Sequence, residues 1–339
     1  MTLASRTEAL LVRHWWQPRP SWLAWLLWPL SRVYLGLFLC QRRRQPPAAA
    51  LPVPVLVVGN HVVGGAGKTP TVMAVVQALL QAGKHPGVIS RGHGRQADAV
   101  QAVRADSTAA QAGDEPLLIR RRCGVPVWVG RDRTAAGRAL CQAHPEVDVL
   151  VSDDGLQHTA LARNAELLLF DERGVGNGLL LPAGPLREPL PATPPPWAHV
   201  LYTAGHQSTA LPGRLAQRHI ATAWPLQAWL QSDRSQSLPL QALRGRPLWA
   251  AAGMAAPEKF FGMLQAQGLT FQRLPLPDHH AYLTPPWPAG TADVITTEKD
   301  AVKLDPAHLG PTRVWVVPLD LQLPAGLMAD LLALLFPVP

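Results

Sequence analysis

The 339-residue sequence has few cysteines and few charged side chains. Its three cysteines, Cys40, Cys123 and Cys141, are an odd number, lie far apart and form no Cys-x-x-Cys pair. We therefore expect neither a disulfide framework nor a structural zinc site, and we expect a reducing compartment. Charged residues make up 16% and hydrophobic residues 47% of the chain. This balance excludes a disordered protein and predicts a globular one with a sizeable core.

Positive charge is scarce outside one short segment. Residues 1–44 contain seven arginines against one glutamate, so they carry +6 of the net charge of +8. Beyond that segment, no basic cluster stands out apart from Arg120–Arg122. A protein that binds nucleic acid usually spreads its positive charge over a face of the folded domain. The distribution therefore argues against a nucleic-acid-binding ATPase and predicts no nucleic-acid partner.

The basic N-terminal segment also contains five of the 12 tryptophans. Arginine and tryptophan that flank leucines are typical of a helix in the headgroup layer of an anionic membrane. The run Ser21–Cys40 has about the 20 residues that cross a bilayer, but Pro29 and Arg32 interrupt it. A central arginine costs roughly 2.5–3.5 kcal/mol on insertion scales. We therefore expect residues 1–44 to form a membrane-associated helix, kinked near Pro29, that lies in the interface. The alternative is a helix that packs on the protein's own core.

Apolar runs and helical patterns alternate through the next part of the chain. A buried strand at 53–58 precedes a glycine-rich turn, and a helix is expected from about Thr69 to Gln81, with Pro70 in its first turn. Continuous apolar strands that alternate with helices predict a mostly parallel sheet with helices on both faces, as in P-loop NTPases. Further strands are expected at 87–90, 125–130, 147–152 and 165–170, with helices at 115–122 and 133–143.

A proline-rich stretch, Pro191–Trp197, is expected to be a hinge region. Strands and helices alternate again after it, from the PLWAAAG run at 247–253 to a terminal apolar helix. The predicted organisation is a membrane-associating segment at 1–44, a P-loop nucleotide-binding domain at 45–195 and a smaller α/β domain at 196–339.

The turn GNHVVGGAGKTP, Gly59–Pro70, follows the first buried strand and opens a helix. Such a turn binds anions, because backbone N–H groups and the positive end of the helix converge on it. A strict phosphate loop would have glycine at the position of Val62. The GGAGKT run nevertheless keeps the final Gly-Lys-Thr of that pattern, which lies nearest the phosphates. Lys68 is expected to reach the β- and γ-phosphates of a nucleotide, and the Thr69 hydroxyl to ligate Mg²⁺. The predicted nucleotide-binding residues are Val62, Val63, Gly64, Gly65, Ala66, Gly67, Lys68 and Thr69.

Carboxylates and histidines supply candidates for the remaining chemistry. Asp153 and Asp154 end a predicted strand and are expected on the Mg²⁺ side of the site. A group that deprotonates or orients the nucleophile could come from Asp114 and Glu115 of GDEP, or from His279 and His280 of PDHH. The alternatives stay open: GDEP could cap a helix, and the histidines could form a polar surface turn.

Eight motifs in order resemble one known family across nearly the whole chain, the tetraacyldisaccharide 4'-kinases, which are the lipid A 4'-kinases of Gram-negative bacteria. The motifs are GNHVVGGAGKTP, SRGHGR (90–95), GDEP (113–116), GRDR (130–133), DDGLQH (153–158), LLPAGPLREP (180–189), PDHH (277–280) and TTEKDAVKL (296–304).

The resemblance implies ATP- and Mg²⁺-dependent phosphorylation of the 4'-hydroxyl of a tetraacylated glucosamine disaccharide 1-phosphate, giving lipid IVA. It places the reaction at the cytoplasmic face of the bacterial inner membrane, in a cleft between two α/β domains. It also implies that Asp114 is the catalytic base, paired with His279, that Lys68 takes part in catalysis, and that Asp153 and Asp154 lie beside Mg²⁺. The residues expected to line the cleft are Arg91, Glu115, Arg133, Gln157, His158, Arg187 and Glu188.

Two positions depart from the family pattern. Family members usually have Ser or Thr at Val62, and they have SRGYG where this chain has His93.

Two other functions remain as alternatives. A membrane-associated P-loop ATPase switch usually carries a lysine just before the GG pair, where this chain has Val63. The second alternative is a soluble small-molecule kinase, in which the apolar N-terminal segment would simply pack into the hydrophobic core.

Overall fold

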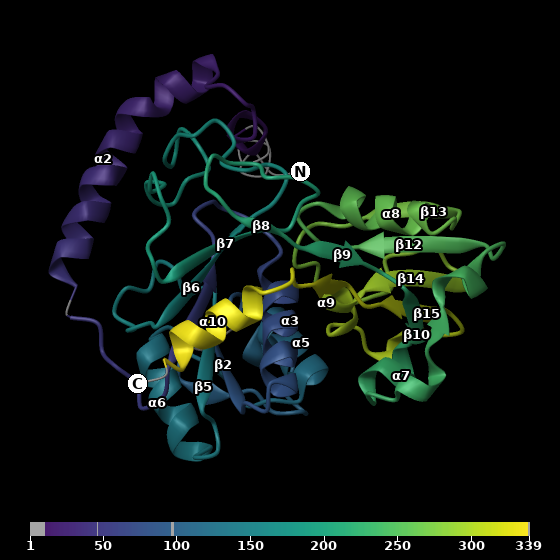
Figure 1. The fold of residues 1–339 in the computed structure, drawn as a ribbon. Helices are drawn as coiled ribbons and strands as arrows, with labels where there is room; N and C mark the ends of the chain where they lie inside the picture. Colours follow the sequence, from purple (N-terminus) through teal and green to yellow (C-terminus); the bar gives the residue numbers. More distant parts are fainter. Residues whose placement is uncertain (1–10, 46, 96–97, 338–339) are drawn as a thin grey trace.

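The computed structural model describes residues 11–45, 47–95 and 98–337, and these residues form two lobes (Figure 1). The first lobe is built on an eight-stranded sheet with the order β3-β4-β2-β5-β1-β6-β7-β8. The second is built on a six-stranded sheet with the order β11-β10-β15-β14-β12-β13. A two-stranded sheet of β9 and β16 connects them.

The first sheet is parallel except where β3 pairs with β4. Side chains of β1 alternate between two cores, as the pleat of a strand requires. Leu56 and Val58 pack in the cluster that contains α3 and α5, whereas Val55 and Val57 pack with Leu140 of α6. Helices therefore cover both faces, which confirms the predicted fold class. The strands are β1 Val55–Gly59, β2 Pro86–Ser90, β3 Gln101–Ala102, β4 Val127–Val129, β5 Val149–Asp153, β6 Ala165–Phe170, β7 Ala198–Tyr202 and β8 Arg214–Leu215; the helices are α3 Lys68–Gln81, α4 Ala109–Ala112, α5 Asp114–Cys123 and α6 Arg133–Ala143.

The second lobe is a smaller α/β layer, as the alternation of its sequence predicts. Its central strands pair in parallel, and β10 and β11 add an antiparallel edge. The strands are β10 Thr222–Pro225, β11 Leu238–Pro239, β12 Leu248–Ala252, β13 Phe271–Pro275, β14 Asp293–Thr297 and β15 Arg313–Val317; the helices are α7 Leu226–Leu230, α8 Pro257–Ala266 and α9 Glu298–Ala301.

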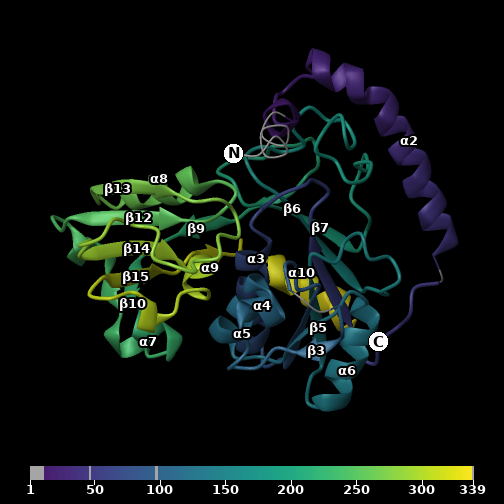
Figure 2. The same ribbon diagram turned by 180° about the vertical axis from the view of Figure 1, so that it is seen from behind.

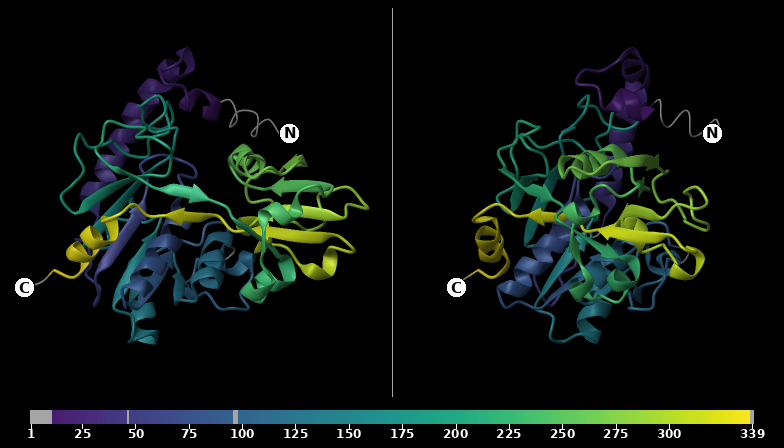
Figure 3. Two further views of the ribbon diagram at one scale, coloured as in Figure 1. Left: turned by 45° about the vertical axis from the view of Figure 1, so that its right-hand side comes forward. Right: turned by 90° about the vertical axis from the view of Figure 1, so that its right-hand side faces the viewer.

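The chain crosses between the lobes at β9, Gln217–His219, and returns at β16, Asp320–Gln322 (Figure 3). Since β7 and β8 belong to the first sheet, this crossing comes later than the domain boundary expected at residue 195. Pro191–Trp197 leads into β7 and not out of the lobe. The last helix, α10 (Leu327–Leu335), comes back to the first lobe and contacts α3 and β6 (Figure 2).

Helix α2, Trp22–Arg44, lies along the outside of the first lobe (Figures 1 and 2). Its buried residues are Ala24 and Ser31, whereas Trp22 is 72% and Leu26 is 66% exposed. The alternative that this helix packs in the core therefore does not hold for most of its surface. Within the described part of the chain, it is the helix whose length and composition suffice to cross a membrane.

Candidate active site

The glycine-rich turn after β1 forms a cradle at the start of α3. Gly64 and Gly67 have φ angles of 88° and 81°, in the left-handed region that glycine adopts without strain. A side chain added at Gly67 would also meet the Thr203 hydroxyl at 3.2 Å. Gly67 is the N-cap of α3, so the free N–H groups of the first helical turn lie beside the cradle. This arrangement is suited to binding phosphate.

Two of the predicted nucleotide-binding residues face inward. Val62 and Ala66 have no exposed surface. The backbone of Val62 bridges to Leu186, and the next N–H, that of Val63, donates to the Pro185 carbonyl at 2.9 Å. The Val62 side chain therefore packs inside the lobe and not against the nucleotide side of the turn. This explains how the turn accommodates an isopropyl group at this position. The exposed side of the turn is formed by Gly64 and Gly65.

Lys68, the first residue of α3, extends back across the turn. Its Nζ lies 3.2 Å from Oδ1 of Asn60 and 3.4 Å from the carbonyl oxygen of Gly64. It also lies 3.5 Å from Oδ1 of Asp154. The ammonium group is thus held between the turn and the end of β5, and the partly exposed Thr69 follows it on the helix.

Asp153 ends β5 directly beside the turn, in register with Val58 of β1. The residue is 1% exposed. Its Oδ2 accepts a hydrogen bond from Ser90 at 3.2 Å, and its Oδ1 is buried with no hydrogen-bond partner among the described residues. Burial, reinforced by the negative charges of Glu115 and Asp154, raises the pKa of Asp153 to about 7.

Asp154 leaves the strand with a φ of 49°, a conformation that non-glycine residues adopt rarely and often at functional sites. Its carboxylate contacts Lys68 and lies 3.1 Å from Nη1 of Arg187. Burial raises the pKa of Asp154, but the charges of Lys68 and Arg187 outweigh it, so the net shift is downward. The two adjacent carboxylates therefore differ: Asp154 is already paired with cations, and Asp153 is not.

The donors around Asp153 fit Mg²⁺. A buried carboxylate oxygen without a partner is unfavourable, and a bound cation relieves it. Among the residues that the structure describes, no group of three or more His, Cys, Asp or Glu side chains could hold a metal. Mg²⁺ does not need such a group, since it keeps several waters and takes one or two carboxylates together with phosphate oxygens. Asp153 offers one such carboxylate, and Thr69, the second residue of α3, would add its hydroxyl.

We expect Asp153→Asn to stabilise the metal-free protein, and to do so more at about pH 8 than at about pH 5. The folded pKa of about 7 lies above the ordinary value near 4. Ionisation of Asp153 therefore destabilises the fold progressively as the pH rises between these two values, and asparagine removes that cost. Thermal melting in excess chelator measures the effect, with Asp106→Asn, at an exposed carboxylate, as control. Equal shifts at both pH values would contradict it.

Asp114 and His279 meet across the two lobes. Asp114 is the first residue of α5 in the first lobe and is 5% exposed. His279 lies between β13 and β14 in the second lobe, and its Nδ1 is 2.9 Å from Oδ2 of Asp114. The backbone of His279 has a φ of 57°, so it too is held in an uncommon conformation. The neighbouring candidate, His280, instead packs edge-on against Tyr282, with ring centroids 4.8 Å apart.

The contact shifts both groups toward their charged forms. Burial raises the pKa of Asp114, but the hydrogen bond with His279 and the charge of Lys299 outweigh it, so the pKa lies below its ordinary value. The same hydrogen bond raises the pKa of His279 against the opposing effect of burial. Lys299, at the start of α9, lies 3.6 Å from Glu115 and 3.0 Å from Asp278. An ionic cluster thus joins the lobes around Asp114.

The SRGHGR segment links this pair to the carboxylates at the end of β5. Ser90 bonds to Asp153, and the ring of His93 lies 5.7 Å from that of His279. Gly113 has a φ of 88°, and a side chain there would meet the His93 carbonyl at 3.0 Å. Glycine is therefore required where the two loops approach. The turn, the carboxylates and the Asp114–His279 pair thus lie around one region.

The other predicted cleft residues divide into three groups. Gln157, Arg187 and Glu188 form a network, in which Gln157 donates to Glu188 at 2.8 Å and accepts from Arg187 at 3.2 Å. Arg133 is buried at the start of α6, close to the carbonyl of Asp154. The third group consists of Arg91 and His158. Arg91 is exposed, and Nε2 of His158 lies 3.7 Å from Oδ1 of Asp132.

Several side chains at the site were not predicted from the sequence. Asn60 accepts from Lys68, and Thr203 donates to the Ala66 carbonyl at 3.0 Å. Arg173 and Arg218 also approach the turn. Asn60 lies inside the glycine-rich motif and could have been considered. The other three lie outside the recognised motifs, and no spacing in the sequence points to them.

Comparison with known proteins identifies the family. A family model described as tetraacyldisaccharide-1-P 4'-kinase matches residues 23–335. The tetraacyldisaccharide 4'-kinase of Leptothrix cholodnii is 52% identical over 341 residues, which cover 98% of this chain and 97% of that protein. The enzyme of the same name from Methylibium petroleiphilum is 52% identical over 92% of this chain and 89% of its own.

A solved structure agrees with the sequence comparison. LpxK from Aquifex aeolicus, crystallised in complex with ATP, has a TM-score of 0.74 and 26% identity to this chain, and the match covers 93% of this chain and 100% of that one. With the nucleotide turn, the paired carboxylates and the Asp114–His279 contact in place, the resemblance seen in the sequence is confirmed, and the chain belongs to the tetraacyldisaccharide-1-P 4'-kinase family.

Proposed function

We propose that the chain is an ATP-dependent kinase that transfers the γ-phosphoryl group of ATP to the 4'-hydroxyl of a tetraacylated glucosamine disaccharide 1-phosphate. Its family and relatives carry this activity in their names. The observation that supports the mechanism most directly is the 2.9 Å contact between Asp114 and His279, made across the lobes.

The cradle would bind the nucleotide. Backbone N–H groups of the turn and of the first turn of α3 face the phosphates, and Lys68 stabilises the charge that spreads over the transferred group. Mg²⁺, when bound, neutralises charge on the phosphate oxygens; Asp153 and the Thr69 hydroxyl would hold it. Asp154, paired with Lys68 and Arg187, keeps these cations in place.

Asp114 would accept the proton of the sugar hydroxyl. A sugar hydroxyl has a very high pKa, so most of the catalysis lies in positioning it and in stabilising charge, and the proton moves late. The pKa of Asp114 lies below its ordinary value, so the side chain is a carboxylate at neutral pH. The His279 imidazole donates to it and fixes its orientation. Because the partners come from different lobes, they assemble only when the lobes are together, which limits ATP hydrolysis without an acceptor.

The lipid acceptor would approach from the side of α2. A hollow of about 190 Å³ lies between this helix and the site. Tyr34 of α2 donates to the Arg187 carbonyl at 2.6 Å, which ties the helix to the cleft. The hollow is lined by Tyr34, Phe38, Gln41, Arg42, Gln45, Gln157, Thr159, Arg187 and Glu188.

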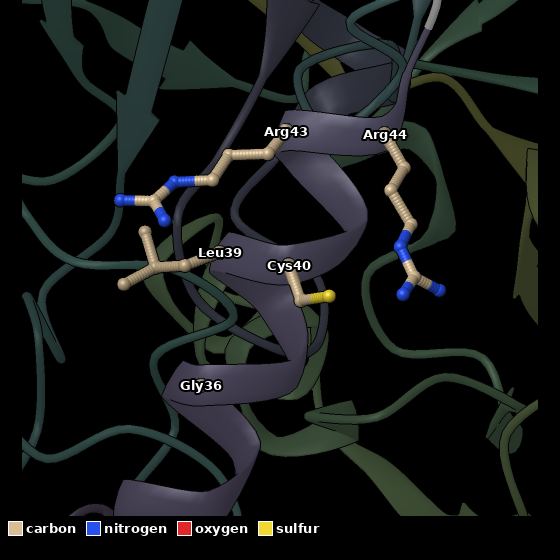
Figure 4. A pocket seen from close by; sticks show the side chains of 5 residues that line it. All are labelled: Gly36, Leu39, Cys40, Arg43 and Arg44. Carbon is tan, nitrogen blue, oxygen red and sulfur yellow. The ribbon is translucent and has the colours of Figure 1, made fainter.

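We also propose that α2 holds the enzyme at the cytoplasmic face of the inner membrane. Four acyl chains leave a bilayer only at a cost of about 0.8 kcal/mol per exposed CH₂, so the enzyme must work at the surface. The exposed tryptophans and leucines of α2 suit the headgroup layer. Figure 4 shows Arg43 and Arg44 extending to different sides at the C-terminal end of α2, where they could reach anionic lipids.

One experiment tests both the kinase activity and the binding of the protein to the membrane. The purified chain is incubated with [γ-³²P]ATP, Mg²⁺ and phosphatidylglycerol vesicles that contain the lipid A precursor lacking the 4'-phosphate. We expect the label to appear on the lipid and the protein to sediment with the vesicles. Neutral vesicles serve as the control for charge. Label that is released only as phosphate would favour an ATPase switch, and protein that stays in the supernatant would contradict the membrane role.

A further inference from the structure

Two arginines that the proposed mechanism does not use hold the nucleotide turn, Arg173 directly and Arg218 through Thr203. Arg173 donates from Nη2 to the Gly65 carbonyl at 3.0 Å. The Thr203 hydroxyl donates to the Ala66 carbonyl at 3.0 Å and accepts a hydrogen bond from Arg218. In a trans peptide the C=O and the following N–H point in opposite directions. Donors that fix these two carbonyls therefore also fix the direction of the next two N–H groups, those of Ala66 and Gly67, which point the opposite way.

Arg173 also joins the turn to two distant parts of the chain. Its guanidinium lies 4.0 Å from the ring centroid of Trp16, a cation–π contact. Its Nε donates to Asp171 at 2.9 Å. Asp171 is 1% exposed, and it also accepts from Lys259 of α8 at 3.0 Å. One side chain thus touches the nucleotide turn, the N-terminal segment and a carboxylate that is shared with the second lobe.

The N-terminal segment is seated firmly on the loop that carries Arg173. The Asn177 N–H donates to the Trp15 carbonyl at 2.8 Å. The Trp15 indole in turn donates to the Pro182 carbonyl at 2.8 Å. These bonds hold the adjacent Trp16 over the guanidinium. Residues 11–16 lie a short distance before α2, which begins at Trp22, so we expect the position of Trp16 to respond to the position of that helix.

We propose that Arg173 is a positioning residue that couples the N-terminal segment to the nucleotide turn. With Trp16 seated, the guanidinium is fixed and the turn keeps the geometry that binds phosphate. With Trp16 displaced, Arg173 loses a partner and the turn is held less firmly. Such coupling is reciprocal, so nucleotide binding favours the seated N-terminal segment by the same factor. The inference rests on the proposed function only in that the turn binds ATP.

Equilibrium binding of a fluorescent ATP analogue to the full chain, without lipid, tests the coupling. We expect Arg173→Ala to weaken binding about tenfold, the loss of a charge-assisted hydrogen bond. We expect Trp16→Leu to weaken it about threefold, the size of a cation–π contact. The double variant should be no weaker than Arg173→Ala, because the effect of Trp16 passes through Arg173. Trp197→Leu, at a 46% exposed tryptophan of the same lobe, should bind as the wild type does.

Steady-state kinetics separates positioning from general damage. Arg173→Ala should raise KM for ATP about tenfold and leave kcat within about threefold, measured at a temperature at which circular dichroism shows the variant folded. If that variant does not fold, Arg173→Lys, which keeps the charge beside Asp171, should still show a raised KM. Wild-type affinity in Trp16→Leu, or additive losses in the double variant, would overturn the coupling. A wild-type chain that does not bind the analogue would instead overturn the proposed function.

Discussion

Replacing Asp114 with asparagine should lower turnover about 10³-fold, within the range of general base catalysis, and leave ATP binding near normal. In the wild type, the Glu115 N–H donates to Oδ1 of Asp114 at 3.1 Å. Asparagine has the same size and keeps an oxygen that can accept this hydrogen bond. It cannot accept a proton, and it cannot form an ion pair with His279. Turnover at saturating ATP and acceptor, and equilibrium nucleotide binding, measure the two effects separately.

The Asp114 prediction has two controls. Asp98→Asn changes an exposed carboxylate that lies 3.8 Å from Arg131, and it should leave turnover unchanged. His279→Gln should lower turnover about tenfold, and combining it with Asp114→Asn should cost little more, since the two residues act as a unit. Turnover near the wild-type level in Asp114→Asn would show that the proton goes elsewhere.

Lys68→Ala is expected to lower phosphoryl transfer by about 10³-fold or more, comparable to the loss of a preorganised donor in an active site. The Lys68 ammonium lies between the turn and Asp154, 3.5 Å from that carboxylate. Without this ammonium group, the start of α3 offers no side-chain positive charge to the phosphates. Asp154 then keeps its ion pair with Arg187 but loses the one with Lys68. We expect ATP binding to weaken as well, because like charges then face each other across the site.

Lys84 offers a matched control for Lys68. It follows α3, and its Nζ lies 3.9 Å above the ring of Phe336, away from the turn. Lys84→Ala should therefore retain the activity of the wild type in the same assay with labelled ATP. A Lys68→Ala variant that transfers phosphate within tenfold of the wild type would show that backbone N–H groups alone bind the nucleotide.

Sequence patterns predict the strongly apolar parts of this fold. The structure places β1, α3, β5, β6, α6 and β12 within a few residues of where the sequence predicts them, because burial on both faces requires continuous apolar strands. The connecting strands were not foreseen. β9 reads Gln-Arg-His and is mostly exposed, so no apolar run marks it. The return of α10 to the first lobe was not foreseen either, because an apolar helix gives no sign of which sheet it covers.

The candidate site divides in the same way. The turn, Lys68 and the two carboxylates are visible because glycine, lysine and aspartate follow predicted strands. The Asp114–His279 pair joins residues 165 positions apart, and the residues alone also allow a helix cap and a surface turn. Only the ordered motifs of the family point to that pair. Arg173 and Thr203 lie on connections between strands, where neither charge nor spacing distinguishes them from ordinary loop residues.

The return of α10 has a consequence for the order of synthesis. Leu327 and Leu331 have no exposed surface and share a core with Val72 and Val76 of α3. The ribosome must therefore make the entire second lobe before the nucleotide lobe can be completed. Until then α3, which begins with Lys68, lacks part of its apolar cover. A nascent chain should therefore bind ATP only after α10, Leu327–Leu335, has emerged from the ribosome.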